Sequence, residues 1–264
     1  MRGWVERALA RFTDAVVFNS KRNEAECRMA GLHARTLTIY NGVEVVETTP
    51  ASAEQILKHF GVPTGATLVG KIAQLHPRKD FPLFLRVAQQ LAKRPGLHFL
   101  IIGDGPERAR LEREVEARGL RGRVTFTGRL ADPLPLIARL KVKLLTSLRE
   151  GMSNALLEAL ALGVPCVVSA AGANGELISN GVEGYVVEGR DPAPFAHRVE
   201  LLLDDPSLWQ RMSANARNRA ATQFSVERMV RAYEALFTEV LSGSPITDPS
   251  LSSDSPPRPS PRVR

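Results

Sequence analysis

Two glutamates, Glu150 and Glu158, have the clearest setting for chemistry in this sequence. A mostly apolar run at 143–147 precedes them and predicts a short buried strand, and a helix-forming run follows. Strand, turn and helix in that order place Glu150 at the carboxyl end of a strand. Glu158 then lies one helical turn past the N-cap, which is Ser153 or Asn154.

The turn between the two glutamates, residues 151–154, leaves backbone N–H groups unpaired at the start of the helix. Free donors and the positive end of the helix dipole coincide there, so the turn attracts an anion such as a phosphate. The carboxylates of Glu150 and Glu158 would repel that anion and are better suited to accept hydrogen bonds from neutral hydroxyls beside it. A phosphate flanked by hydroxyls describes a sugar nucleotide.

A basic loop supplies a counter-charge for such an anion. Lys79 ends the run 74–79, between a predicted strand and a helix, where its ammonium group can neutralise a phosphate at the same crevice. Arg78 is expected at the surface, and His76 is left without an assigned role. Lys79 is therefore the second candidate site residue beside Glu150.

A glycine-rich turn, Gly103-Asp-Gly105, follows a predicted strand and opens a helix. Arg108 stands where a dinucleotide fingerprint has its third glycine, so an NAD-dependent oxidoreductase is disfavoured. Two interpretations stay open: the glycines make a tight strand-to-helix turn, or they form the floor at one edge of a nucleotide pocket. On the second interpretation, Gly103 is a candidate ligand-binding residue.

Motifs for a resident cofactor or metal are missing from the sequence. It has no Asp-x-Asp pair that could hold a divalent ion on a diphosphate, no Walker loop and no Gly-x-Ser-x-Gly elbow. Its histidines lack Cys, His or carboxylate partners at ligand spacing. We therefore predict a site that uses neither a metal nor a cofactor.

Composition is that of an ordinary globular protein, with 264 residues of which 44% are hydrophobic. Two cysteines, Cys27 and Cys166, are unsuited to a disulfide framework, and neither a signal leader nor an apolar run of membrane-spanning length stands out, so we expect a cytoplasmic protein. The formal net charge of +7 could favour a nucleic acid or an anionic membrane as partner.

The basic residues between Arg108 and Arg129 are interspersed with glutamates, which is typical of a solvated face. We predict no nucleic-acid partner and at most a weak peripheral contact with phospholipid headgroups at the inner face of the cell membrane. Arg129, which follows a predicted strand, is kept as a candidate ligand-binding residue.

From Thr67 onward, short apolar runs alternate with amphipathic segments, which predicts an α/β fold with a doubly wound parallel sheet. Ligands on such sheets bind beyond the carboxyl ends of the strands, where Lys79 and Glu150 are expected. Asp191 and Asp205, each followed by proline, mark two helix starts. The predicted strands cover 68–75, 98–102, 124–127, 142–146, 166–169 and 184–187, and a predicted helix covers 81–92.

The two ends of the chain differ from this centre. Strands at 15–18 and 36–40 are too few for a domain of their own and are interpreted as the closing part of a preceding domain. The predicted organisation is this remnant with an interdomain linker at 1–45, a Rossmann-like nucleotide-sugar-binding domain at 46–224, an amphipathic crossing helix at 225–241 and a disordered Ser/Pro/Arg tail at 242–264.

These motifs, in this order, resemble the retaining family 4 glycosyltransferases of GT-B fold. The resemblance is carried by 74–79, 103–105, 150–158, 161–169 and 184–187, and the pair of glutamates with the Gly-Val-Pro after it is the most specific part. In that family two Rossmann-like domains face each other, the second binds the nucleotide sugar, and the final helix crosses back to brace the first. The resemblance implies that this chain is the C-terminal, donor-binding half, with the N-terminal domain mostly missing.

The resemblance also implies roles for the candidate residues. Glu150 would face hydroxyls of the transferred sugar, Glu158 the ribose hydroxyls, and Lys79 the charge growing on the leaving diphosphate. The oxocarbenium-like centre left behind would be attacked from the same face by an acceptor hydroxyl, without a covalent enzyme nucleophile. The other implied donor-binding residues are Gln74, Gly103, Arg129, Gly151, Met152, Ser153 and Asn154, those of the turn acting through backbone amides.

Two departures from the family pattern stand out. Gln74 occupies the place where the family usually has an arginine, so one charge-assisted phosphate contact becomes a neutral bond of roughly half the strength. The acceptor domain is missing, so either the sequence is a fragment or a separate polypeptide supplies that domain in trans. Alone, the chain is expected to bind the donor poorly, to transfer little and to self-associate through uncovered apolar faces at 15–18 and 225–241.

Three functions are compatible with these observations. The first is transfer of a sugar from a nucleoside-diphosphate sugar to a glycan or lipid-linked acceptor, in polysaccharide, lipopolysaccharide or glycolipid assembly. The second is that of a GT-B relative such as a sugar-nucleotide epimerase or a phosphorylase, which the spacing of the two glutamates disfavours. The third is a non-catalytic nucleotide-sugar-binding module, which the missing domain keeps open.

Overall fold

The computed structural model describes residues 12–32, 34–44 and 49–242. The chain forms two compact units, a larger one over Asn41–Arg228 and a smaller one from the segments up to Tyr40 and from Met229 onward. All but the first residue of the predicted tail at 242–264 lies outside the described residues. The predicted domain boundaries stay predictions.

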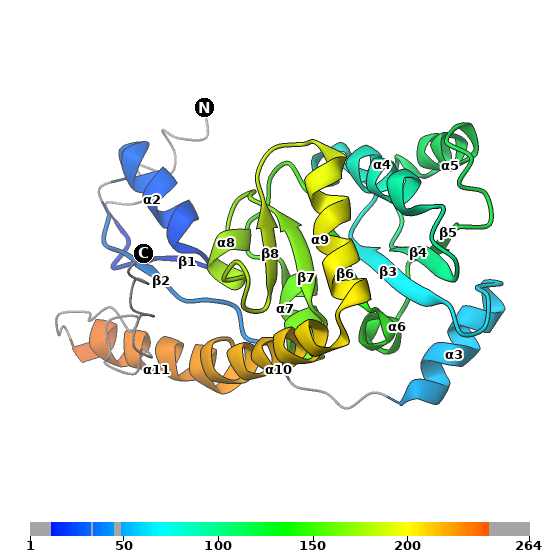
Figure 1. The fold of residues 1–264 in the computed structure, drawn as a ribbon. Helices are drawn as coiled ribbons and strands as arrows, with labels where there is room; N and C mark the ends of the chain where they lie inside the picture. The colour runs from blue at the N-terminus through cyan, green and yellow to red at the C-terminus, as the bar shows by residue number, and fades with distance from the viewer. Residues whose placement is uncertain (1–11, 33, 45–48, 243–264) are drawn as a thin grey trace, which may run out of the picture. The chain divides into compact units, whose positions relative to one another are not determined.

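The larger unit is built on a six-stranded parallel sheet in the order β5-β4-β3-β6-β7-β8 (Figure 1). This confirms the predicted α/β fold. β3 ends at Ile72 instead of residue 75, because the backbone turns where the N–H of His76 donates to the carbonyl of Gln74. The strands are β3 (Thr67–Ile72), β4 (Leu97–Ile102), β5 (Val124–Gly128), β6 (Val142–Leu145), β7 (Cys166–Ser169) and β8 (Gly184–Val187).

The strand order reverses beside β3. β4 and β5 extend to one side of it, whereas β6, β7 and β8 extend to the other, so that β3 and β6 are neighbours. The loops that follow these two strands therefore leave the sheet at its topological switch point, where open α/β sheets bind their ligands. Lys79 belongs to the first of these loops and Glu150 to the second.

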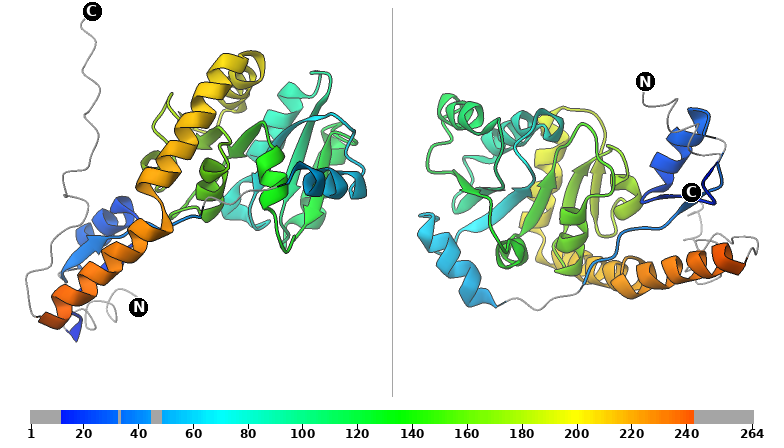
Figure 2. Two further views of the ribbon diagram at one scale, coloured as in Figure 1. Left: turned by 90° about the horizontal axis from the view of Figure 1, so that it is seen from below. Right: turned by 180° about the vertical axis from the view of Figure 1, so that it is seen from behind.

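Helices cover both faces of the sheet (Figure 2). Asp191 and Asp205 cap the helices that follow them by accepting from backbone N–H groups, as their Asp-Pro sequences predict. Among the helices that the structure describes, none combines the length and the apolar character needed to cross a membrane. The helices of this unit are α3 (Pro50–His59), α4 (Phe81–Leu91), α5 (Arg108–Ala117), α6 (Leu134–Arg139), α7 (Asn154–Ala161), α8 (Asn174–Leu177), α9 (Pro192–Asp204) and α10 (Pro206–Gln223), with a short 3-10 helix η2 (Pro77–Lys79).

The smaller unit has its own apolar cluster. Leu37 and Ile39 pack with Leu236 of the last helix, so the predicted crossing helix has a covered apolar face within this unit. Phe237 and Leu241 of the same helix stay exposed, and self-association through them stays a prediction. The elements are β1 (Val16–Phe18) and β2 (Thr36–Thr38), paired in parallel, with α2 (Lys21–Met29) and α11 (Val226–Ser242).

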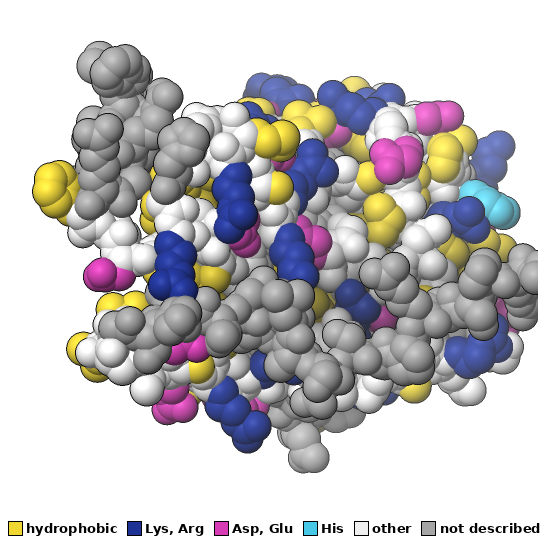
Figure 3. Space-filling view, turned by 90° about the vertical axis from the view of Figure 1, so that its left-hand side faces the viewer, with side chains coloured by type: hydrophobic (Ala, Val, Ile, Leu, Met, Phe, Trp, Pro, Cys, Tyr) yellow, Lys and Arg dark blue, Asp and Glu magenta, His cyan; other side chains and the backbone are white. Residues whose placement is uncertain are grey.

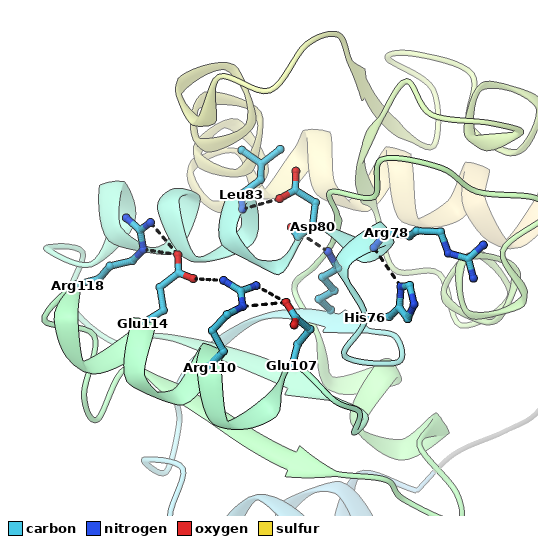
Figure 4. A network of polar contacts seen from close by, with 9 residues as sticks. His76, Arg78, Asp80, Leu83, Glu107, Arg110, Glu114 and Arg118 are labelled. Carbon is cyan, nitrogen blue, oxygen red and sulfur yellow. Dashed lines mark hydrogen bonds and ion pairs between the residues drawn. The ribbon is translucent and has the colours of Figure 1, made fainter.

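Charged side chains of both signs occur together on part of the surface. On the face in Figure 3, Lys and Arg side chains stand apart, with acidic and apolar side chains between them. On α5, Arg110 pairs with Glu107 and Glu114, and Arg118 also pairs with Glu114 (Figure 4). These two arginines are therefore neutralised locally, as the interspersed glutamates predict.

Candidate functional site

The loops after β3 and β6 are joined by hydrogen bonds. The backbone N–H of Leu148 donates to the carbonyl of Arg78 at 2.9 Å, and Thr146 Oγ1 donates to the carbonyl of Asp80 at 2.8 Å. Because β3 and β6 are neighbours in the sheet, these contacts bring together two segments that are far apart in the sequence.

Lys79 and Glu150 form an ion pair at the centre of this site. Lys79 Nζ lies 2.9 Å and 2.8 Å from the two carboxylate oxygens of Glu150, and Ser147 Oγ donates to the same carboxylate at 2.6 Å. The Glu150 side chain is 6% exposed and that of Lys79 is 28% exposed. Removing Lys79 would leave an enclosed charge uncompensated. The sequence predicts both residues at one crevice, and the structure brings them into direct contact.

The loop that carries Lys79 is closed by local hydrogen bonds (Figure 4). His76 Nδ1 accepts from the backbone N–H of Arg78 at 3.2 Å, and the N–H of Lys79 donates to the carbonyl of His76 at 2.9 Å. Asp80 adopts the left-handed conformation with φ 46° and caps α4 by accepting from the N–H of Leu83. His76 thus has a structural role that the sequence does not reveal, and Arg78 is exposed as predicted.

The turn between the two glutamates presents backbone N–H groups at the start of α7. Ser153 is the N-cap residue, but its side chain makes no capping bond. Within the described ranges, no carbonyl accepts from the amides of residues 151–154. Asn41 anchors the turn instead, because its backbone N–H donates to Met152 Sδ at 3.1 Å and its side-chain amide donates to Asn154 Oδ1 at 2.7 Å. Donors therefore remain at the positive end of the helix.

Glu158 lines a pocket of about 460 Å³. Burial raises the pKa of its carboxyl group, Lys143 opposes that rise, and Asp132 adds to it. A carboxylate that has lost part of its water is stabilised when a ligand supplies hydrogen-bond donors. The pocket wall next to Glu158 includes Asn154 and Leu157, which come from the same helix.

Two lysines that the sequence analysis missed lie inside the sheet. Lys71 of β3 and Lys143 of β6 are completely buried. Lys71 Nζ has oxygen acceptors, with Thr146 Oγ1 at 2.6 Å among them, whereas Lys143 Nζ has no hydrogen-bond partner in the described part of the chain. Burial lowers the pKa of Lys143 to about 8 and lowers the pKa of Lys71 well below its usual value. The sequence signal that could have revealed these two buried residues is a lysine within each of two apolar strand runs.

Three other predicted residues lie in the segments that follow β3, β4 and β5. A Cβ at Gly103, where φ is 135°, would overlap the carbonyl of Ala73, so a glycine is required for the turn after β4 to pack against the loop after β3. This requirement accounts for the glycine in a tight strand-to-helix turn, and a role for Gly103 at the edge of a nucleotide pocket stays a prediction. Gln74 is exposed in the loop after β3, and Arg129 is exposed after β5, two strands away. Their binding roles stay predictions.

No group of three or more His, Cys, Asp or Glu side chains in the described ranges is placed to hold a metal ion. Metal independence and the absence of a cofactor stay predictions.

Comparison with known proteins identifies the family. Residues 52–219 match the family of glycosyl transferases group 1, and since this match covers more than half of the chain, the protein belongs to that family. The resemblance to GT-B glycosyltransferases seen in the sequence is thereby confirmed, and glycosyltransferase is the enzyme class of its named relatives.

Individual relatives agree with this assignment. The chain is 28% identical over 204 residues to the N-acetyl-alpha-D-glucosaminyl L-malate synthase of Bacillus anthracis. The aligned region covers 77% of this chain and 54% of that protein. The chain is also 28% identical over 209 residues to the UDP-Gal:alpha-D-GlcNAc-diphosphoundecaprenol alpha-1,3-galactosyltransferase of Escherichia coli, with the same two coverages of 77% and 54%. The chain thus spans about half the length of these curated relatives.

A solved structure shows the same fold. The crystal structure of HepE from Anabaena, in complex with UDP and glucose, superposes with a TM-score of 0.81 at 26% sequence identity. The superposition covers 90% of this chain and 66% of HepE.

Proposed function

We propose that this chain is the donor-binding part of a retaining glycosyltransferase, which moves a sugar from a nucleoside-diphosphate sugar to a glycan or lipid-linked acceptor. The observation that carries the proposal is the Lys79–Glu150 pair at the switch point, beside the unbonded amides at the start of α7. A cation and amide donors suit a diphosphate, and a carboxylate suits sugar hydroxyls.

Two of the similar proteins support the choice of ligands. HepE was crystallised with UDP and glucose. The Escherichia coli relative is named for a UDP-Gal donor and a diphosphoundecaprenol-linked acceptor. Both are compatible with a nucleoside diphosphate at Lys79.

In the proposed complex, the Lys79 ammonium group gives up part of its contact with Glu150 and donates to the donor diphosphate. Glu150 keeps the hydrogen bond from Ser147 and accepts sugar hydroxyls with its remaining lone pairs. Glu158, in its pocket next to α7, accepts the ribose hydroxyls. Lys79 and Glu150 thus lose part of their contact with each other, and each gains hydrogen bonds to a polar group of the donor.

The reaction breaks the bond between C1 of the sugar and the diphosphate oxygen, and it forms a bond between C1 and the acceptor oxygen on the same face. The acceptor proton passes to the leaving diphosphate, and no covalent bond to the enzyme forms. In the proposed complex, Lys79 and the amides of residues 151–154 face the oxygen on which negative charge develops, so they lower the barrier. Loss of one such donor costs on the order of 3 kcal/mol, by analogy with oxyanion holes.

Calorimetry of the chain with UDP, GDP and ADP tests the proposal. We expect one nucleotide to bind, and Lys79→Met to weaken its binding roughly tenfold to a hundredfold, because a hydrogen bond to a charged group contributes about 1.5–3 kcal/mol. Glu150→Gln should keep nucleotide binding, since Glu150 faces the sugar. Lys58→Met, at an exposed position of α3, is the matched control. Absence of heat with all three nucleotides would refute donor binding.

A non-catalytic nucleotide-sugar-binding module is the second candidate. The observation compatible with it is that the site built from Lys79, Glu150 and the amides of residues 151–154 is assigned to the donor alone. Another segment or polypeptide would then supply the acceptor side. Release of the nucleoside diphosphate from its sugar, measured with the chain alone and with an acceptor domain added in trans, separates the candidates: binding without release in either mixture favours the module.

A further inference from the structure

Lys71 is enclosed directly beneath the loop that carries Lys79. Its Nζ donates to the backbone carbonyl of Lys79, donates to Thr146 Oγ1 at 2.6 Å, and lies 3.5 Å from the carbonyl of Asp80. The same nitrogen lies 4.3 Å from the centre of the Phe81 ring, which closes the remaining side. Lys71 is completely buried, so its amine serves these internal acceptors and does not reach a ligand.

Thr146 connects this lysine to the neighbouring strand. Its hydroxyl accepts from Lys71 Nζ and donates to the carbonyl of Asp80 at 2.8 Å. The next residue, Ser147, donates to the carboxylate of Glu150 at 2.6 Å, and its own carbonyl accepts from Ser169 Oγ at 2.7 Å. Hydrogen bonds on Lys71 and Thr146, the peptide bond from Thr146 to Ser147, and the Ser147 hydroxyl thus connect the backbone beside Lys79 to the carboxylate that Lys79 contacts.

The backbone beside Lys79 needs such support. Asp80 has a φ of 46° and is the one residue other than glycine with positive φ in the described ranges. A left-handed conformation is unfavourable for a residue with a Cβ and persists where its surroundings hold it. Asp80 is held by its cap on Leu83 N–H and by an ion pair with Arg190 at 2.7 Å, and its carbonyl is held by Thr146.

We propose that Lys71 is a positioning residue for the donor site: acting with Thr146, it fixes the backbone of Lys79 and Asp80 so that the Lys79 ammonium group meets Glu150. The proposal rests on the proposed function of that ion pair. A methionine at position 71 could still pack against Phe81, but it would leave the Lys79 carbonyl without its buried donor. The backbone that carries the Lys79 side chain would then no longer be held in place.

Hydrogen–deuterium exchange of the full chain tests the positioning role without any ligand. In Lys71→Met, amides within residues 76–83 should exchange about tenfold faster, because the hydrogen bonds that close this loop open more often. Thr146→Val removes the hydroxyl that joins Lys71 to the Asp80 carbonyl and should speed exchange in the same segment. This second variant keeps the test decisive if Lys71→Met does not fold. Lys93→Met is the control, since Lys93 is an exposed lysine whose replacement should leave exchange at 76–83 unchanged. Unchanged exchange at 76–83 in both test variants would overturn the proposal.

Calorimetry with UDP supplies a second readout, which a merely structural role would not move. Lys71→Met should raise the Kd for UDP about tenfold when Lys79 is present and should have no further effect when Lys79→Met is already in place. Equal effects of Lys71→Met in both backgrounds would show that it does not act through Lys79. If the unmodified chain binds none of UDP, GDP and ADP, the proposed function fails, whereas the exchange experiment still decides whether Lys71 fixes the loop; if GDP or ADP binds in place of UDP, the same comparison is made with that nucleotide.

Discussion

Replacing Lys143 by methionine should make the protein more stable at neutral pH. Lys143 lies in the middle of the sheet on β6, is completely buried, and has an Nζ without a hydrogen-bond partner in the described part of the chain. A buried charge is costly when nothing compensates it, and an apolar side chain of similar length removes that cost.

The size of the effect follows from the pKa of the lysine. Burial lowers it from 10.5 to about 8, although the nearby Cys166 and Glu158 act to raise it. Each unit of pKa corresponds to about 1.4 kcal/mol, so the protonated form of Lys143 costs the folded state about 3 kcal/mol. This cost applies in full below pH 8, where the lysine is protonated in both the folded and the unfolded protein.

The cost disappears at higher pH. Between pH 8 and pH 10.5 the unfolded protein holds a proton on Lys143 that the folded protein has released, so stability rises with pH in this window. The advantage of Lys143→Met should therefore fall from about 3 kcal/mol at pH 7 to about 2 kcal/mol at pH 9 and to under about 1 kcal/mol at pH 10. Differences in packing between the two side chains add an offset that does not depend on pH.

Urea unfolding followed by tryptophan fluorescence measures this difference, because Trp209 lies in the same unit and packs against its core. Unfolding curves at several values between pH 6 and pH 10 are compared for the unmodified chain, for Lys143→Met and for Lys93→Met. Lys93 is exposed, so its replacement should change stability little at any pH. If the advantage of Lys143→Met does not change with pH, then the buried ammonium group is not its source and the reasoning is wrong.

Two further predictions concern the stability of the larger unit at Gly103 and His98. Gly103→Ala should destabilise the larger unit by about 2–3 kcal/mol in urea unfolding, because its Cβ would overlap the Ala73 carbonyl at a positive φ; Gly175→Ala, where the added Cβ meets nothing, is the control, and equal effects would contradict the steric argument. Burial is the main cause that lowers the pKa of His98 to about 4, so the protein should lose stability in urea unfolding as the pH falls from 6.5 to 4, because unfolding then takes up a proton. His98→Phe should reduce this loss of stability between pH 6.5 and pH 4, and an unchanged loss would refute the assignment.

Local signals in the sequence are sufficient for much of the fold. Alternation of apolar runs with amphipathic segments predicts the parallel sheet, and β7 and β8 have the predicted bounds. Asp-Pro pairs predict the starts of α9 and α10, because an N-cap side chain and a proline act within one turn of the chain. The position of Glu150 after a strand and of Glu158 within the next helix follows from the same short-range rules.

Contacts between distant segments are decided by the tertiary structure. The direct pairing of Lys79 with Glu150 depends on β3 and β6 being neighbours, which is a matter of strand order and not of any local pattern. For the same reason the sequence alone does not distinguish Lys71, whose amine finds acceptors across the β3–β6 boundary, from Lys143, whose amine finds none. By itself the sequence determined which chemical groups lie at the carboxyl ends of the strands. Which of those groups touch was decided only by the packing of the sheet, because burial and hydrogen bonding depend on neighbours that are remote in the chain.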